Sequence, residues 1–451
     1  MKFGLFYEHQ LPRPWTEDSE RQLIQDALDQ IEFADNIGIH CAWEVEHHFL
    51  EEYSHSSAPE VFLAAASQRT KNIRLGHGII QTAPGYNHPA RTAERVAMLD
   101  LVSNGRVEFG SGESSSEAEL GGFGIEQFTK RDQWREGLEV AVRCMTEAPF
   151  TGYDGTWVSI PPRNVVPKPV QKPHPPLWVA CSRRDTILLA AELGIGALTF
   201  AFIDPEEAVH WITDYETTLA NKGVPIGQAV NANVACVTPM MCAPSEDDAI
   251  RMGLEGGNFF GYSLAHYYVF GDHVPGQTNV WEEFLERRDK MGYSPEAAIA
   301  LEQERLGAKV AAGDNSGLRG AVGTPDQIRE FLRRYEEAGV DQLIFVMQAG
   351  KNRHEDIMES LELFGRDVLP EFAERDDAQV AAKASRLEPI IEQVMGRKVD
   401  DRPLMPEGYV MKALPKQMAE QVPNPQLEKW MEEFADKRAV GDRDADFGIL
   451  G

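Results

Sequence analysis

The segment WEVEHHF, residues 43–49, ends a short apolar stretch with two adjacent histidines, His47 and His48. Histidine is the side chain that most readily takes up and releases a proton near neutral pH. Adjacent residues of a strand point to opposite sides, so one histidine could face a reaction site while packing or a backbone contact holds the other. The simpler alternative is a pair that only caps a strand. The groups that the fold brings beside the pair decide between the two.

Ionisable residues also lie in the later part of three other strand-like stretches or directly after them, namely Glu8 with His9, His77, and Glu113. Metal-dependent hydrolysis and chemistry on an organic cofactor both fit such a set. The chain has no His-x-His on its first strand and no H-E-x-x-H, which are common metal-binding arrangements. Side chains from separate strands could still gather around a metal ion, so both classes stay open at this point.

A second candidate site begins in the segment LWVACSRRDTI. Ser182 stands where a helix is expected to begin, which is a favourable N-cap position. Arg183 and Arg184 follow in the first turn, where the helix dipole disfavours positive charge. A bound phosphate would offset this placement and accept the free backbone N–H groups, and Arg131 at the start of another predicted helix could add a contact. Ordinary surface charges are the alternative.

Strand-like and helix-like segments alternate along the chain, which predicts parallel strands joined by helical crossovers. A stretch rich in proline and glycine at 148–176 breaks this rhythm and is expected to be an inserted hairpin. Eight such units predict a (β/α)8 TIM barrel. The predicted strands are 2–8, 41–46, 73–81, 106–113, 177–181, 196–200, 231–242 and 341–348.

Two parts depart from the barrel pattern. Residues from about 251 to 323 form an insertion before the last β/α unit, within a barrel domain predicted at 1–372. Residues 373–451 form a C-terminal extension that we expect to be helical and partly irregular. In this extension, the segment NPQLEKWMEEFADKR has apolar residues on one side of a helix. This side must pack against the barrel or against a partner subunit, and we favour packing in a homodimer.

The composition limits the partners. The formal net charge of −28 argues against binding to nucleic acid or to anionic membranes. The five cysteines are scattered without a C-x-x-C pair, so neither a zinc ribbon nor a disulfide framework is indicated. No signal-peptide pattern and no apolar run of about 18 residues occurs. We therefore expect a cytoplasmic protein.

In several segments the sequence resembles the bacterial luciferase-like, flavin-dependent monooxygenase superfamily. The resemblance rests on MKFGLFYE, WEVEHHF, LGHGII, HPARTAERVAMLDLVSNGRVEFGSG, LWVACS and VGTPDQI, which follow one another between residues 1 and 372. It implies a barrel that holds reduced flavin mononucleotide (FMN), supplied by a separate NAD(P)H-dependent flavin reductase. It also implies a reaction with O2 in which the protein excludes water and manages protons.

The resemblance also implies roles for individual residues. His47 matches the family's catalytic-base histidine, and the Gly78–Ile79 bond falls where members often carry a non-proline cis peptide. We expect the insertion to cover the pocket and to line it for an apolar substrate with Phe259, Tyr262, His266 and Tyr267, although a small helical core is the alternative for these residues. The expected cofactor-binding residues are His77, Gly78, Ile79, Gly112, Arg131, Val179, Ala180, Cys181, Ser182 and Arg183.

The sequence departs from the luciferase pattern at Gly112 and Glu113, where the light-emitting subunit has a cysteine and a phosphate-binding arginine. The segment GSGES resembles the family's deazaflavin-dependent dehydrogenases, in which a glutamate at the position of Glu113 donates a proton and the histidine at His48 works beside the ring. A dehydrogenase that uses an 8-hydroxy-5-deazaflavin coenzyme is therefore the second hypothesis. A metal-dependent hydrolase is the third, although no metal ligands are predicted.

Overall fold

The computed structural model describes residues 1–199, 205–290, 320–422 and 424–441. The chain divides into two compact units, Met1–Asp401 and Arg402–Gly451. The first unit contains the barrel and its insertion, and the second contains two of the C-terminal helices. The predicted boundary between residues 372 and 373 lies inside the long helix α13, Leu369–Gly396.

Eight parallel strands close into a ring, as the sequence predicts. Their order around the ring is β1, β2, β3, β5, β8, β9, β10, β12 and back to β1. Each lies within or close to a predicted strand. The strands are β1 Lys2–Tyr7, β2 Cys41–Glu44, β3 Arg74–His77, β5 Val107–Gly112, β8 Leu177–Cys181, β9 Gly196–Thr199, β10 Val234–Cys242 and β12 Gln342–Val346.

Four short strands extend this plan. The strand β4, Ile80–Gln81, pairs with β5, and β11, Ala321–Gly323, pairs with β10. An antiparallel hairpin of β6, Tyr153–Asp154, and β7, Ser159–Ile160, lies in the stretch predicted to contain a hairpin. The described part of the predicted insertion contains helices and β11, whereas residues 291–319 of that prediction lie outside the described residues.

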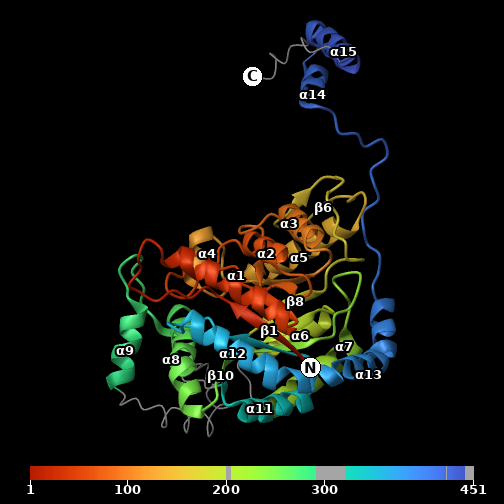
Figure 1. Ribbon diagram of the computed structural model, residues 1–451. Coiled ribbons are helices and arrows are strands. Elements are labelled where there is room, and N and C mark those ends of the chain that lie inside the picture. The colour runs from red at the N-terminus through yellow and green to blue at the C-terminus, as the bar shows by residue number, and fades with distance from the viewer. Residues whose placement is uncertain (200–204, 291–319, 423, 442–451) are drawn as a thin grey trace. The chain divides into compact units, whose positions relative to one another are not determined.

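Helices surround the ring of strands, and local sequence signals set several of their ends (Figure 1). Gly38 ends α1 in the left-handed conformation, with φ 96°, which glycine adopts without steric cost. Thr324 and Gln327 form a capping box at the start of α11. The helices of the barrel unit besides α13 are α1 Ser19–Ile37, α2 Pro59–Arg69, α3 Pro89–Val102, α4 Glu117–Phe123, α5 Lys130–Thr146, α6 Arg184–Glu192, α7 Pro205–Lys222, α8 Glu246–Ala265, the π-helix η1 His266–Phe270, α9 Val280–Lys290, α11 Pro325–Ala338 and α12 His354–Asp367.

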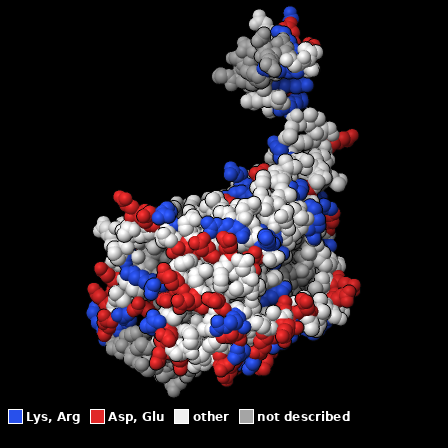
Figure 2. Space-filling view, viewed as in Figure 1, with Lys and Arg blue, Asp and Glu red and all other residues white. Residues whose placement is uncertain are grey.

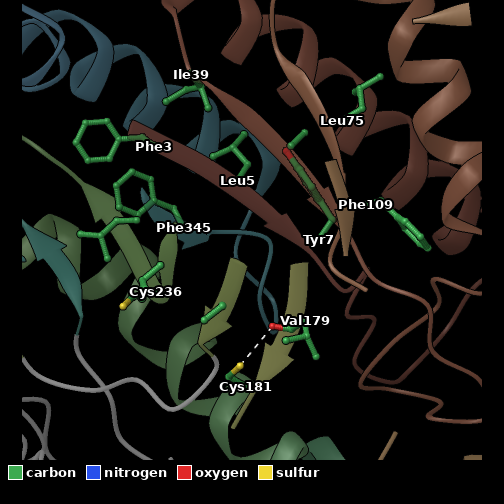
Figure 3. Close-up of a cluster of buried hydrophobic side chains, with 14 of the residues drawn as sticks. Phe3, Leu5, Tyr7, Ile39, Leu75, Phe109, Val179, Cys181, Cys236 and Phe345 are labelled. Carbon is green, nitrogen blue, oxygen red and sulfur yellow. Dashed lines mark hydrogen bonds between the residues drawn. The ribbon is translucent and has the colours of Figure 1, made fainter. Parts of the chain in front are cut away.

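The barrel has two apolar layers because side chains alternate along each strand. On β1, Phe3, Leu5 and Tyr7 point outward and pack with helix residues in what we call the outer layer, part of which Figure 3 shows. Phe6 points inward and belongs to the inner layer, which fills the barrel. This alternation determines which strand residues point into the barrel at its mouth. By the mouth we mean the end of the barrel at which the strands have their carboxyl ends.

Two tryptophans pack against each other within the inner layer. The rings of Trp43 and Trp178 meet edge to face, with centroids 5.5 Å apart. Gly76 and Gly196 leave room for them, because a Cβ atom at either glycine would come within 2.3 Å and 2.4 Å of a tryptophan ring. The barrel below the mouth is therefore solid rather than a channel, as in other barrels of this size.

The second unit contains α14, Leu414–Gln421, and α15, Pro425–Ala439. Trp430 and Phe434 stack on each other along α15, with ring centroids 5.2 Å apart. No residue of α15 is buried. The apolar residues predicted for one side of this helix are half-buried, because α14 packs against α15.

Acidic and basic side chains are intermingled on the face of the molecule that Figure 2 shows, with no continuous basic area visible there. Among the described residues, no helix combines the length and the apolar character that crossing a membrane requires. All five cysteines are buried and free.

Candidate active site

Glu8 and His47 meet at the mouth from the loops that follow β1 and β2, which end at Tyr7 and Glu44. Glu8 stands two residues after Phe6 and His47 two residues after Val45, and both of these apolar residues belong to the inner layer. Both ionisable residues follow the carboxyl ends of their strands, where active sites of barrels lie. The Nε2 atom of His47 is 3.6 Å from the Oε2 atom of Glu8.

Each of these two side chains is held by another residue. The Nδ1 atom of His47 lies 3.0 Å from Oε1 of Glu119, a fully buried residue of α4. Glu119 also accepts hydrogen bonds from the Ser114 hydroxyl at 2.7 Å and the backbone N–H of His48 at 3.1 Å. The Tyr53 hydroxyl donates to Oε1 of Glu8 at 2.8 Å. A continuous line of polar groups therefore runs from Glu119 through His47 and Glu8 to Tyr53.

The charged groups in this line shift one another's pKa values. Burial alone would lower the pKa of His47, but the carboxylates of Glu119 and Glu8 raise it to about 9. Burial raises the pKa of Glu8 to about 7, although His47 and Tyr53 oppose the rise. Burial would also raise the pKa of Glu119, yet His47 and the bonds from Ser114 and His48 lower it. At neutral pH, His47 is thus largely protonated and Glu8 is close to its midpoint.

His48 occupies a different environment, as expected for the neighbour of His47. Its Nε2 atom lies 3.2 Å from Oε1 of Glu46, and its ring packs edge to face on Phe123. Glu46 is fixed in turn by the backbone N–H of Gln81 at 2.7 Å and the amide of Asn87 at 2.9 Å. The two histidines therefore have separate carboxylate partners.

The structure does not bring His77 and His9 to the mouth. His77 is fully buried in the outer layer, where its ring meets Phe109 edge to face. Burial lowers its pKa to about 4, so this imidazole is neutral near pH 7. His9 lies 2.9 Å from Glu44 and packs against Phe62 of α2. Among the described residues, no group of three histidine, cysteine or carboxylate side chains has the arrangement of a metal site.

The wall beneath the mouth is formed partly by Ile79, which belongs to the inner layer. A Cβ atom at Gly112 would come within 2.5 Å of the Ile79 side chain, so glycine is needed there. The resemblance suggested a cis peptide at Gly78–Ile79, but that expectation is wrong for this structure. All cis bonds found in the described part of the chain precede proline.

Backbone strain also concentrates around the mouth. Of the non-glycine residues with positive φ in the described part of the chain, three flank the site: His9 at 53°, Phe49 at 65° and Ser114 at 53°. Such conformations cost free energy and persist where the surrounding structure enforces them, often at functional sites.

The predicted phosphate site brings together the first turns of α5 and α6. Arg131 lies 3.1 Å from Glu113 and 3.5 Å from Asp185, which stands in the first turn of α6. Arg183 lies 3.2 Å from the same Asp185. Lys130 donates to the Ser115 hydroxyl at 3.0 Å. We call these five charged residues, Lys130, Arg131, Arg183, Glu113 and Asp185, the cationic corner.

Two details of this corner differ from the sequence prediction. The N-cap of α6 is Arg183 rather than Ser182, and the Arg183 backbone N–H donates to the Thr186 hydroxyl at 3.3 Å. Arg184 turns away from the corner to pair with Asp214. Ser182 is exposed immediately before the helix. The electrostatics remain favourable for an anion, because three cations face two carboxylates.

Residues 179–181 alternate between the layers. Val179 and Cys181 lie in the outer layer, and the Cys181 thiol donates to the Val179 carbonyl at 3.5 Å (Figure 3). Ala180 packs against the inner layer. Only the backbone of Val179 and Cys181 can therefore contribute to a site inside the barrel.

The aromatic residues of the insertion separate into two groups. Phe259 and Tyr262 form a local core with Trp281 and Phe284, which agrees with the alternative of a small helical core. His266 lies 3.3 Å from His273, with Glu283 at 3.4 Å on its other side. Tyr267 and Tyr268 instead approach Tyr53, with ring centroids 6.4 Å from it.

Sequence reasoning missed Glu119, Tyr53 and Lys130. Glu119 lies in a polar segment for which no helix was expected, although Ser116 and Glu119 have the S-x-x-E spacing that marks a helix start. In the structure Ser116 makes no side-chain cap, and the Glu119 carboxylate bonds to His47 instead. The spacing could have indicated α4, but not the contact with His47.

Comparisons with known proteins agree with this architecture. The family model described as luciferase-like monooxygenase matches residues 1–342. The oxygenase component of a flavin-dependent trigonelline monooxygenase from Acinetobacter baylyi is 24% identical over 378 residues, which cover 83% of this chain and 96% of that protein. An uncharacterised protein, y4wF, from Sinorhizobium fredii is 33% identical over 189 residues, and this match spans 42% of this chain and only about half, 53%, of that relative.

Among solved structures, the coenzyme F420-dependent tetrahydromethanopterin reductase from Methanopyrus kandleri has the same fold. Its TM-score is 0.55 at 23% identity, and the match covers 82% of this chain and 99% of that chain. This likeness supports the barrel and, at such identity, nothing finer.

Proposed function

The chain belongs to the luciferase-like monooxygenase family, and we propose that it uses reduced FMN and O2 to oxygenate an apolar organic substrate. The reaction would be a hydroxylation or an insertion of oxygen beside a carbonyl group, as in Baeyer–Villiger chemistry. The observation that carries this proposal is the pairing of a buried histidine–carboxylate line with a cationic corner at the same end of one barrel. Trigonelline oxygenation by the Acinetobacter relative gives further support.

The residues of the cationic corner fit the phosphate of FMN. Arg131 and Arg183 can exchange their carboxylate partners for a phosphate, and the first turn of α6 supplies free backbone N–H groups. Lys130 adds a third cation, whose pKa is lowered by burial. The bound flavin would supply the reducing equivalents and the reaction with O2, and the backbone of residues 179–182 together with Ile79 and Gly112 would border it.

His47 is the residue that we propose to transfer protons at the mouth. Its Nδ1 atom is committed to Glu119, so the ring has a fixed orientation and presents only Nε2 to the barrel interior. Such fixation by a buried carboxylate is typical of histidines that act as acids or bases. The neighbouring aromatic rings of Tyr53, Tyr267 and Tyr268 support an apolar substrate.

The proposal extends to partners and location. We infer a transient NAD(P)H-dependent flavin reductase, since the related trigonelline enzyme is an oxygenase component. A homodimer is supported by exposed apolar side chains on neighbouring helices, Val61 on α2 and Met98, Leu101 and Val102 on α3. A cytoplasmic location is supported by the five free cysteines, because thiols stay reduced in that compartment.

A deazaflavin-dependent dehydrogenase is the second candidate. It is favoured by Glu113, whose Oε2 atom is buried without a hydrogen-bond partner and is therefore available to a ligand. The fold shared with an F420-dependent reductase is compatible with it. Against it, the other oxygen of Glu113 is bonded to Arg131, and this pair would have to separate before Glu113 could donate a proton.

Anaerobic titration distinguishes the two candidates. Reduced FMN and reduced deazaflavin are added separately while tryptophan fluorescence is recorded, because Trp43 and Trp178 line the barrel. O2 is then admitted and its uptake measured. Quenching by reduced FMN followed by O2 consumption supports the monooxygenase, whereas binding of deazaflavin without O2 consumption would replace it with the dehydrogenase.

A further inference from the structure

The Oε2 atom of Glu8 is buried and has no hydrogen-bond partner. The other oxygen of the same carboxylate is held by Tyr53 at 2.8 Å, so the side chain cannot turn freely to find one. Glu8 is only 3% exposed. A carboxylate oxygen without a hydrogen-bond partner at such a depth costs free energy, which a ligand that donates a hydrogen bond to it would recover.

The unpartnered oxygen points toward the one nitrogen of His47 that is also uncommitted. The distance of 3.6 Å between Oε2 and Nε2 is too long for a hydrogen bond. It is short enough for one further atom to contact both groups at once. Because Nδ1 is bound to Glu119, the ring of His47 cannot swing away from this position.

We propose that Glu8 is a second catalytic residue, which accepts a proton from the bound reactant while the charged ring of His47 stabilises the anion that results. This inference deepens the proposed function and rests on it. The existing O–H or N–H bond of the reactant breaks, and its electron pair stays on the reactant. A new O–H bond forms on Oε2 of Glu8, and the reverse transfer restores the starting state.

The division of roles follows from proton occupancy. A histidine that is protonated on both nitrogens is a donor only, so His47 in its charged form cannot take the proton. The pKa of Glu8, raised to about 7 by burial, lies where a general base works best. The groups that face Glu8 and bias its titration are His47, Tyr53, Glu119, Glu44 and Tyr268.

None of these neighbours can substitute for Glu8. Glu44 points to the outer layer, where it pairs with His9. Glu119 is occupied by three donors. The pKa values of Tyr53 and Tyr268 are raised by burial, so both phenols stay protonated near pH 7. Glu8 is therefore the group of this cluster that can accept a proton at that pH, whereas His47 in its charged form can only donate one.

Nitrogen-15 NMR of histidine-labelled protein tests the inference without any flavin or substrate. The His47 signals, assigned with a His47→Gln variant, should show two steps in the wild-type protein. One step, near pH 7, reports the charge on Glu8, and the other, near pH 9, is the ionisation of His47 itself. In Glu8→Gln, which keeps an oxygen for Tyr53, the first step should vanish and the second should fall by about 1 unit or more.

Glu117→Gln is the matched control, because Glu117 is an exposed carboxylate in the same helix as Glu119, and it should leave both steps in place. A single step in the wild-type protein, or two unchanged steps in Glu8→Gln, would overturn the inference. The titration of the wild-type protein tests the inference by itself, even if the variant fails to fold. A failure here leaves the flavin proposal intact, and a failure to bind reduced FMN leaves the two titration steps intact.

Discussion

The histidine–carboxylate line at the barrel mouth and the cationic corner are both built from charged residues, but their surroundings differ. In the line, Glu8 and Glu119 are buried, and the neighbouring charges raise the pKa of His47 to about 9. In the corner, the side chains of Arg131 and Arg183 are 40% and 68% exposed. Buried charges shift one another strongly, whereas exposed pairs are screened by water and exchange partners at little cost.

This difference suggests a division of labour. Groups that must move a proton benefit from displaced pKa values and fixed geometry, which the buried line provides. Groups that must bind and release an anion benefit from solvent access and weak existing pairs. Changes in the line should therefore affect turnover and stability, and changes in the corner should affect affinity.

The largest effect is expected for His47→Ala. Loss of the ring that we propose to transfer protons should lower turnover about 100-fold or more, while the affinity for reduced FMN stays nearly unchanged because the corner is intact. Steady-state O2 consumption and anaerobic fluorescence titration measure the two quantities. A variant with wild-type turnover would show that His47 has no catalytic role. It would also contradict the functional difference proposed between the line and the corner.

The pH dependence of stability is the next largest effect. The folded state raises the pKa of His47 from 6.5 to about 9, so its stabilising contribution is complete below pH 6.5 and is lost as the pH rises toward 9. The pKa of Glu8 is raised from 4.5 to about 7, so charging this buried group also lowers stability between those values. Each window should remove on the order of 2–3 kcal/mol from the free energy of unfolding.

Urea unfolding at a series of pH values measures these losses. In Glu8→Gln the free energy of unfolding should no longer fall between pH 4.5 and 7. In His47→Gln it should no longer fall between pH 6.5 and 9. A free energy of unfolding that rises between pH 6.5 and 9 would contradict the assignment of a charged His47.

Arg131→Ala should weaken the binding of reduced FMN about 10-fold, the lower end of what a hydrogen bond to a charged group contributes, because the side chain is partly exposed. The affinity for reduced riboflavin, which has no phosphate, should be unchanged. Arg184→Ala is the matched control, since Arg184 pairs with Asp214 outside the corner. Equal losses for FMN and riboflavin would mean that Arg131 does not contact the phosphate.

The smallest effect is expected for Asp185→Asn. This carboxylate pairs with Arg131 and Arg183 and, on our proposal, competes with the phosphate for them, so its neutralisation should strengthen FMN binding about two- to fivefold. Stability should change by no more than about 0.5 kcal/mol, because the pairs are exposed. Weaker FMN binding would show that Asp185 supports the corner rather than competes within it.

The sequence predicts the barrel well because each strand is a compact apolar run that lies between helices with clear periodicity. It also predicts that His47 and His48 diverge, and their side chains do so, although both lie just past the end of β2. Within the strands, side chains alternate between the two layers. The same alternation explains why His77, Val179 and Cys181 point into the outer layer. Their positions along the chain are near the site, but their side chains face away from it.

Other features depend on contacts that no local pattern encodes. Glu119 reaches His47 across 72 residues of chain, and nothing in a polar segment distinguishes a carboxylate that will be buried from one that stays in water. Lys130 precedes the expected Arg131 by one residue, yet only the fold brings it to Ser114 and Ser115. The aromatic residues of the insertion look alike in sequence, and packing alone separates Tyr262 from Tyr268.

A crystal structure of the protein with FMN would test the central claim most directly, namely that the two regions serve one cofactor. We predict that the phosphate contacts Arg131 and the first backbone N–H groups of α6, with the flavin ring at the mouth beside Nε2 of His47. A flavin whose phosphate lies away from the cationic corner, or whose ring does not reach His47, would contradict the account.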